Sequence, residues 1–192
     1  MHVLAVAQKL FYWRGIRATG IDAVAAEAQV APTTLYRLFD SKDDLVAAYV
    51  AANAESYKAW VAEATQADLG PPRTRLLALF DALAEQVQPE RCRGCPFLMT
   101  LAEFPDRDHP ARVEAVATKA WVRQYLRGLT AELAADTPVA DPDELADQIV
   151  IIMEGVYASV QALGADGPAK QGRQLAAILL DAATRPELAN GD

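Results

Sequence analysis

Proline- and glycine-rich breaks divide the chain into stretches of helical length, and this spacing restricts the fold more than any other feature. The breaks lie at residues 69–72, 89–94, 105–110, 136–142 and 164–168. Between them apolar residues recur three and four positions apart, as they do on one face of a helix. Alanine, the best helix former, fills 39 of the 192 positions. The sequence therefore predicts an all-α fold of about nine helices.

Local signals indicate where these helices begin and end. Gly15 predicts the end of the first helix, because glycine readily adopts the left-handed conformation that closes a helix. Thr19 with Asp22, and Ser41 with Asp44, have the spacing of a capping box. The predicted helices are three short ones before residue 40, followed by 41–67, 73–88, 96–104, 110–135, 142–164 and 169–184.

The charge is distributed unevenly. The chain carries a net charge of −8, yet residues 1–49 hold five basic and five acidic residues and are neutral. This balance argues against a protein that coats nucleic acid, but it permits a local reading surface. Apolar runs such as Ile149–Met153 fall well short of the roughly 18 residues that span a membrane. With two cysteines and no recognisable export signal, we expect a reduced, cytoplasmic protein that does not enter a membrane.

The first 40 residues predict a helix-turn-helix, since three short helices fit there with a tight turn between the second and third. The third helix of such a unit enters the major groove. Of its exposed residues, Thr33 and Thr34 suit base edges or a thymine methyl group, and Arg37 suits guanine. Tyr36 and Lys42 suit phosphate contacts. Periodicity alone leaves an ordinary helical hairpin with solvated polar residues as an equal alternative.

A pattern of residues at defined spacings favours the helix-turn-helix over the ordinary helical hairpin. It comprises Leu10, Phe11, Gly15, Thr19, Val24, Ala25, Ala28, Val30, Thr34, Leu35, Tyr36, Phe39, Ser41, Lys42 and Leu45. The pattern resembles the N-terminal domain of the tetracycline-repressor (TetR) family over residues 3–46, without a gap. The resemblance implies a DNA-reading domain of residues 1–46, with the motif at about 20–39, and an effector-binding and dimerisation domain of residues 47–192.

The resemblance also implies a function. Members of the family are homodimeric transcription regulators, usually repressors, which bind double-stranded operator DNA and release it when a small molecule binds the C-terminal domain. Carried over residue by residue, the positions that commonly face DNA are Thr19, Thr33, Thr34, Tyr36, Arg37 and Lys42.

Two residues depart from the family pattern at the turn of the motif. Gln29 stands where glycine is usual, so a left-handed backbone there would cost up to about 1 kcal/mol relative to glycine. Ala31 replaces the usual serine at the start of the third helix and forgoes about 1 kcal/mol of capping. Pro32, which follows, partly compensates by presetting the helical backbone.

Two apolar helices near the C-terminus predict the dimer interface. Helix 142–164 carries apolar side chains three and four residues apart, and helix 169–184 does the same with Leu175, Ile178 and Leu179. These helices could pack on their twofold copies as a four-helix bundle. The alternative is that they only complete the core of one chain.

The middle of the chain supplies candidates for an effector pocket. Pockets are mostly apolar with a few polar groups, and Trp121 and Tyr125 are four residues apart on one helical face. The alternative for the aromatic residues is an ordinary core, and for Glu103 a bond to an arginine or a backbone amide. We predict that a small apolar or aromatic effector contacts Trp60, Phe80, Phe97, Glu103, Trp121, Tyr125 and Tyr157.

The remaining chemical motifs are weak. Cys92 and Cys95 have CxxC spacing, but a zinc site would need two further ligands, and the only histidines are His2 and His109. Cys95 precedes a predicted helix, where the dipole favours a thiolate, so a redox switch stays a hypothesis. The sequence holds no P-loop, GxGxxG, GxSxG or HExxH motif, so we expect no enzyme, cofactor or metal. The competing function is a helical-bundle ligand-binding or cysteine-based redox or metal sensor with weak or lost DNA binding.

Overall fold

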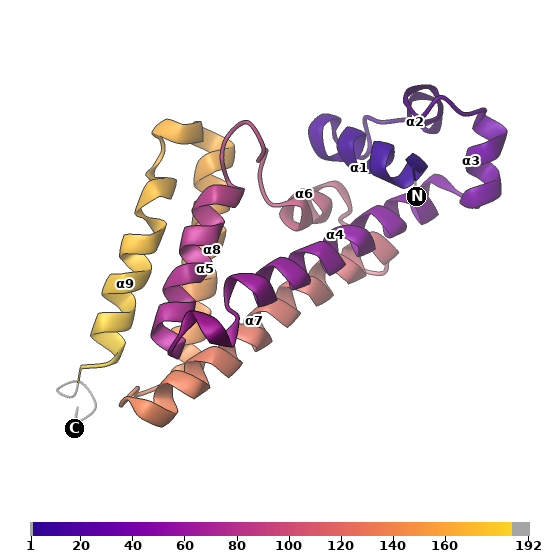
Figure 1. Cartoon of the computed structure of the whole chain (residues 1–192). Helices are drawn as coiled ribbons and strands as arrows, with labels where there is room; N and C mark the ends of the chain where they lie inside the picture. The colour runs from indigo at the N-terminus through magenta and orange to yellow at the C-terminus, as the bar shows by residue number, and fades with distance from the viewer. Residues whose placement is uncertain (1, 186–192) are drawn as a thin grey trace. The chain divides into compact units, whose positions relative to one another are not determined.

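A computed structural model describes residues 2–185, and within this range the chain forms helices and their connections without any strand (Figure 1). The predicted all-α class is confirmed. Three short 3₁₀ turns lie at Ala67–Leu69, Gly164–Asp166 and Pro168–Gln171. The α-helices of the described residues are α1 (His2–Arg14), α2 (Ile21–Glu27), α3 (Pro32–Leu38), α4 (Lys42–Ala64), α5 (Pro72–Gln86), α6 (Pro96–Glu103), α7 (Pro110–Asp136), α8 (Pro142–Leu163) and α9 (Gly172–Ala183).

The predicted boundaries agree with these helices to within about three residues. Prolines begin α3, α5, α6, α7 and α8, as expected for a residue whose missing N–H has no partner in the first helical turn. The last helix starts later than predicted, because the stretch 164–171 forms two 3₁₀ turns before α9. Residues 186–192 of the predicted C-terminal domain lie outside the described residues.

The chain packs into two compact units that do not coincide with the predicted domains. Among the described residues, the first unit holds 2–57 together with 96–119, and the second holds 58–95 together with 120–185. The long helices α4 and α7 each contribute one part to each unit. The first unit is therefore larger than a head of residues 1–46, because α6 and the start of α7 pack with it.

The core of the first unit is built around aromatic residues of α1 and α4. Phe11 and Tyr49 are both buried, with ring centroids 5.5 Å apart in an edge-to-face arrangement. Leu35 of α3 and Leu45 of α4 are also buried. These contacts make α3 part of a rigid helical unit.

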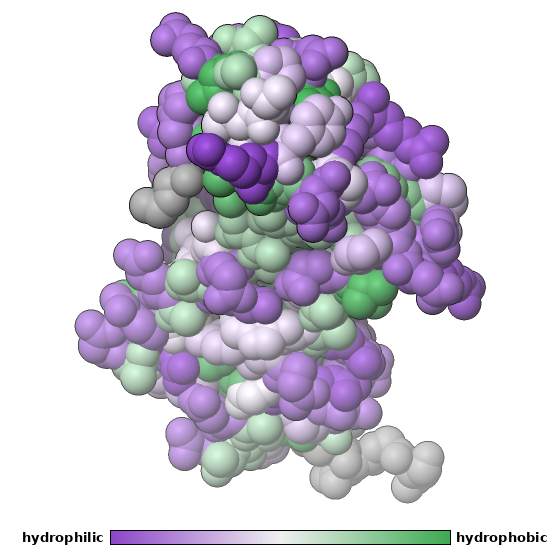
Figure 2. Space-filling view, turned by 90° about the vertical axis from the view of Figure 1, so that its right-hand side faces the viewer, coloured by the Kyte–Doolittle hydropathy of each residue, from purple (hydrophilic) through white to green (hydrophobic). Residues whose placement is uncertain are grey.

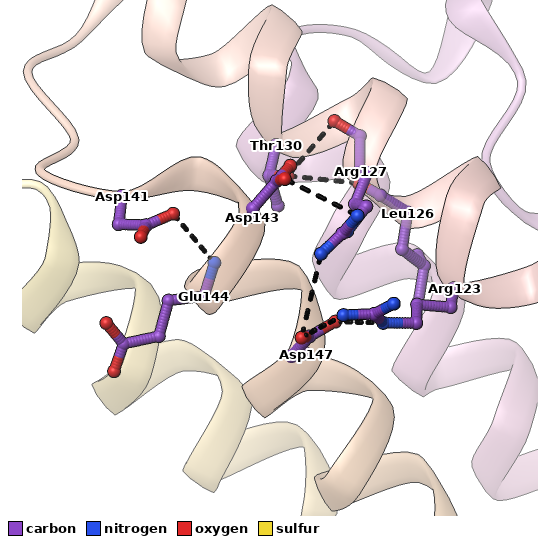
Figure 3. Close-up of polar contacts among 8 residues, drawn as sticks. All are labelled: Arg123, Leu126, Arg127, Thr130, Asp141, Asp143, Glu144 and Asp147. Carbon is purple, nitrogen blue, oxygen red and sulfur yellow. Dashed lines mark hydrogen bonds and ion pairs between the residues drawn. The ribbon is translucent and has the colours of Figure 1, made fainter.

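The second unit packs α5, α8 and α9 on one another, with Leu83, Ile149, Met153 and Leu180 fully buried. Exposed ion pairs join the second half of α7 to the start of α8 (Figure 3). Arg123 donates two hydrogen bonds of 2.6 Å to the carboxylate of Asp147. The hydrogen bond from Arg123 lowers the pKa of Asp147, and the charges of Arg123 and Arg127 act in the same direction against the opposing effect of desolvation.

Helix α8 is more apolar than the short runs in its sequence suggest. Taken over a whole window, 142–166 is the one stretch among the described residues that is long and apolar enough to cross a membrane by length and composition. Core helices of folded domains pass the same test. Here α8 buries Leu145, Ile149 and Met153 in the second unit and pairs Asp143 and Asp147 with arginines.

The surface is otherwise mixed. Hydrophilic side chains cover much of the face seen in Figure 2, and hydrophobic ones appear between them in smaller patches. Because single exposed apolar side chains are ordinary, only a continuous apolar surface calls for an explanation.

Candidate nucleic-acid interface

The turn between α2 and α3 holds Gln29 in a strained backbone conformation. Gln29 has a φ of +55°, the left-handed region, and it is the only described residue other than glycine with a positive φ. The turn is closed by hydrogen bonds from the amide of Gln29 to the carbonyl of Ala26 (3.1 Å) and from Val30 to Ala25 (3.0 Å). Because the backbone is left-handed here, the cost of up to about 1 kcal/mol relative to glycine applies to Gln29.

The start of α3 is uncapped, as predicted. Ala31 occupies the N-cap position with an extended backbone and no side-chain hydrogen bond, and Pro32 follows in the first turn. The amide of Thr34 donates to the carbonyl of Ala31 at 2.8 Å. The proline therefore helps to begin a helix that lacks the usual hydroxyl cap.

One side of α3 is anchored and the other is free to solvent. Leu35 is 1% exposed, whereas Tyr36 is 55% exposed. Thr33 and Arg37 are also exposed, and Thr34 is half-buried. The four residues predicted to contact DNA from this helix thus reach solvent to different degrees.

Leu38, at the end of α3, is 54% exposed and was not predicted as a surface residue. The helix ends at Leu38, so this side chain lies beside the exposed Arg37.

Thr19 does not cap α2, contrary to the sequence prediction. It is 2% exposed, and its hydroxyl donates to the carbonyl of Gly15 at 2.8 Å. The N-cap of α2 is Gly20, which makes no side-chain capping bond, so the predicted capping box of Thr19 and Asp22 is wrong. The reason is competition: the backbone at Gly15, with a φ of +95°, precedes a turn in which its carbonyl is within reach of the threonine hydroxyl.

The start of α4 matches its prediction. The hydroxyl of Ser41 accepts from the amide of Asp44 at 3.1 Å and donates to its carboxylate at 2.8 Å. Lys42 is half-buried, and its Nζ donates to the carbonyl of Arg17 at 3.4 Å. The lysine therefore holds the α1–α2 loop, and its amine lies in the first unit beside that loop.

An apolar groove of about 610 Å³ lies between α8 and α9 in the second unit. Ile151 is 69% exposed and Ile178 is 57% exposed, and both line it. Other apolar residues of α8, such as Ile149 and Met153, are buried in the core. The two helices therefore divide their apolar side chains between the core of the unit and an open surface. The groove is lined by Ile151, Ile152, Gly155, Val156, Ser159, Pro168, Ala169, Gln171, Gly172, Gln174, Leu175 and Ile178.

Comparison with known proteins identifies the family to which this chain belongs. Residues 3–49 match the family model described as bacterial regulatory proteins of the tetR family. Residues 72–176, more than half of the chain, match the tetracyclin repressor-like C-terminal domain. The chain belongs to the TetR family. The TetR family consists of transcriptional regulators rather than enzymes, which makes a DNA-binding regulator the functional class of this chain.

Similar proteins come from several bacteria. The HTH-type transcriptional regulator YjdC of Escherichia coli K12 is 27% identical over 80% of this chain and 78% of its own length. The crystal structure of SCO4454, a TetR-family regulator from Streptomyces coelicolor, has a TM-score of 0.88 at 27% identity and covers 96% of this chain and 95% of its own. A TetR regulator from Streptomyces avermitilis is 30% identical with a TM-score of 0.78, over 95% and 96% of the two chains.

In this TetR-family chain, the residues predicted to contact an effector are divided between the two units. Phe97 is buried in the first unit, with its ring 5.4 Å from that of Tyr57. In the second unit Trp121 stacks on Tyr125 with centroids 5.0 Å apart, which confirms that they share a helical face. Phe80 is buried and Trp60 is half-buried.

The hydroxyls of two tyrosines in the second unit form hydrogen bonds. Tyr157 is buried and donates to Oε1 of Gln86 at 2.6 Å. The hydroxyls of Tyr125 and Thr65 lie 2.8 Å apart. These bonds are what a core tyrosine needs, and the role of both residues in effector binding stays a prediction.

The carboxylate of Glu103 bonds to two backbone amides. Its Oε1 accepts from the amide of Ile16 at 3.0 Å, and its Oε2 accepts from the amide of Arg17 at 2.6 Å. The carboxylate therefore has backbone partners in the first unit, and the backbone-amide alternative to an effector contact is confirmed.

Within the described residues neither cysteine of the CxxC motif forms a disulfide, and both are buried. The thiol of Cys92 donates to the carbonyl of Gly94 at 3.8 Å. Between residues 2 and 185, no group of three or more His, Cys, Asp or Glu side chains is placed to hold a metal ion.

Proposed function

We propose that this chain is a homodimeric transcriptional repressor of the cytoplasm, which binds a near-palindromic operator through α3 and releases it when a small effector binds. The observation that carries the proposal is the exposed side of α3, anchored by buried Leu35 and following a tight turn within the matched TetR domain. A short helix with a polar outer side, held rigidly by its inner side, suits a major groove.

The proposed reading residues have distinct tasks. Arg37 pairs with a guanine, and Thr33 and Thr34 contact base edges or a thymine methyl group. Tyr36 and Lys42 contact phosphates, which orient the head without reading sequence. Thr19 has no side-chain role in this proposal, because its hydroxyl is bonded inside the head.

The groove of α8 and α9 supports the proposed dimer. A fully buried isoleucine contributes about 1.5–3 kcal/mol relative to an exposed one, and Ile151 and Ile178 are both largely exposed in the single chain. A second copy, related by a twofold axis, would cover them with its own α8 and α9. The same axis would set the two α3 helices about 34 Å, or a multiple of it, apart on one side of the DNA.

The proposed effector is small and apolar or aromatic. Stacked Trp121 and Tyr125 of the second unit offer one wall for it, and Trp60, Phe80 and Tyr157 are further aromatic residues of the same unit. An effector that prefers a conformer unable to place both heads on DNA would lower operator affinity by shifting the population.

Binding to DNA from the region upstream of the chain's own gene tests this proposal. Fluorescence anisotropy should show tight binding to one duplex of that region and affinity at least about a thousandfold weaker for a scrambled duplex. Affinity should fall steeply as salt rises, because phosphate contacts release counterions. Equal, weak binding to every duplex, including those selected from a random library, would favour the competing class of helical-bundle sensor.

A further inference from the structure

A carboxylate from α6 holds the loop that follows α1. Glu103 is the last residue of α6, and its two oxygens accept hydrogen bonds from consecutive amides, Ile16 at 3.0 Å and Arg17 at 2.6 Å. The partners are 87 and 86 residues apart in sequence. Both ends of the contact lie in the first unit.

The loop presents these amides because of how α1 ends. Gly15 has a φ of +95° and donates to the carbonyl of Phe11 at 3.0 Å, which closes the helix. The amides of the next two residues then point to the same carboxylate. A negative charge near a helix C-terminus is normally unfavourable, so its presence here depends on two charge-assisted hydrogen bonds, which are stronger than neutral ones.

The same loop carries the contact of Lys42. The carbonyl of Arg17 accepts from Nζ of Lys42 at 3.4 Å, while the amide of Arg17 donates to Glu103. The guanidinium of Arg17 lies over the ring of Phe104, 5.7 Å from its centroid. One residue of the loop is thus held by α6, by the residue after α6 and by the start of α4.

We propose that Glu103 is a positioning residue for DNA binding: by fixing the amides of Ile16 and Arg17, it sets the α1–α2 loop and the amine of Lys42 that the loop receives. This inference rests on the proposed function, since it assumes that Lys42 contacts DNA. It makes the operator-binding arrangement of the head depend on α6, which lies far outside the sequence of the helix-turn-helix.

Substitutions of Glu103 in the full-length protein test this role against a matched control. Glu103→Gln keeps the size of the side chain but sets an amide donor against one of the two N–H groups. Asp106→Asn is the control, because Asp106 lies in the connection between α6 and α7 and its carboxylate accepts from the nearby amide of Asp108, a bond that asparagine can still form. Each variant removes one negative charge. If only weaker repulsion of the DNA phosphates mattered, both variants would bind DNA more tightly.

The positioning role predicts a different result for the two variants. Glu103→Gln should weaken operator binding about tenfold, the size expected for a lost charge-assisted bond, while its affinity for scrambled DNA stays within about twofold. Asp106→Asn should bind both duplexes as the wild type does or slightly more tightly. Glu103→Asp, which retains both oxygens, should recover part of the operator affinity.

Amide hydrogen exchange tests the contact between Glu103 and the loop without DNA. The amides of Ile16 and Arg17 should exchange slowly in the wild type and in Asp106→Asn, and faster in Glu103→Gln, with thermal unfolding of each variant checked by circular dichroism. If the wild type binds no operator, the proposed function fails. If it binds one and Glu103→Gln binds equally well, or the exchange of both amides is unchanged, the positioning role of Glu103 is overturned.

Discussion

The outer side of α3 and the groove of α8 and α9 both expose side chains in the single chain, but those of α3 are mainly polar and those of the groove are mainly apolar. Helix α3 is seven residues long, with a buried leucine and a mainly polar outer side. The groove presents aliphatic residues over two long helices. Recognition of base edges depends on where single donors and acceptors lie, whereas association depends on the apolar area removed from water. Substitutions should therefore change specificity at α3 and oligomeric state at the groove.

The largest expected effect comes from a charge placed in the groove. Ile178→Asp would bury a carboxylate without a partner in a dimer, so sedimentation velocity should show a monomer. Operator affinity should fall by at least about a hundredfold, because the second head no longer binds as part of the same particle.

An exposed aliphatic residue elsewhere serves as the control for Ile178→Asp. Val113 is 53% exposed on α7 and lies outside the groove. Val113→Asp should leave both the sedimentation coefficient and the operator affinity near those of the wild type. A wild-type protein that is fully monomeric at micromolar concentration would contradict the assignment of the groove.

At α3 the expected change is in selectivity. Arg37→Ala should lose about 1–3 kcal/mol of discrimination at one operator position, measured by competition with duplexes substituted at each base pair. Lys42→Ala should weaken binding to all duplexes by nearly the same factor and reduce the slope of affinity against salt. Unchanged selectivity in folded Arg37→Ala would remove Arg37 from the reading residues.

The turn that positions α3 offers a smaller effect, on stability alone. Gln29→Gly should raise the free energy of unfolding by up to about 1 kcal/mol, because glycine adopts a positive φ without strain. Gln29→Ala keeps a Cβ atom and should show no such gain in urea unfolding. A loss of stability in the glycine variant would mean that the glutamine side chain has a role in the turn.

The smallest effect belongs to the polar edge of α8, where Asp147 pairs with Arg123. The pKa of Asp147 is lowered in the folded chain, so its contribution to stability is present above its unfolded pKa of about 3.9 and is lost as the pH falls through the folded value. Asp147→Asn should therefore be slightly less stable than the wild type at pH 7, and this difference should shrink as the pH falls below about 3.9. Because the pair is exposed, high salt should reduce the difference at pH 7.

The sequence predicted best the features that depend on neighbouring residues. The uncapped Ala31 and the capping box of Ser41 both follow from short-range geometry, and the same geometry singled out Gln29 as the position where a left-handed backbone would be strained. The same spacing rule failed at Thr19, where a backbone carbonyl made free by Gly15 competes for the hydroxyl.

Long-range partners could not be predicted in this way. Glu103 stands in an apolar stretch, which says only that its carboxylate needs a partner. Folding brings the amides of Ile16 and Arg17 to this carboxylate. Since every residue except proline has a backbone N–H, the sequence does not single out these two. Likewise, periodicity along 142–164 left open whether its apolar residues face the core or a second copy, and the fold places Ile149 in the core while Ile151 lies on the open surface.

The mass and footprint of the protein on its operator test the central claim, that two chains read DNA together through α3. Sedimentation equilibrium should give two chains per duplex, or a multiple of two, and hydroxyl-radical footprinting should show two protected half-sites about 10 base pairs, or a multiple, apart. One chain per duplex with a single protected site, or a protein that protects no duplex, would contradict the account.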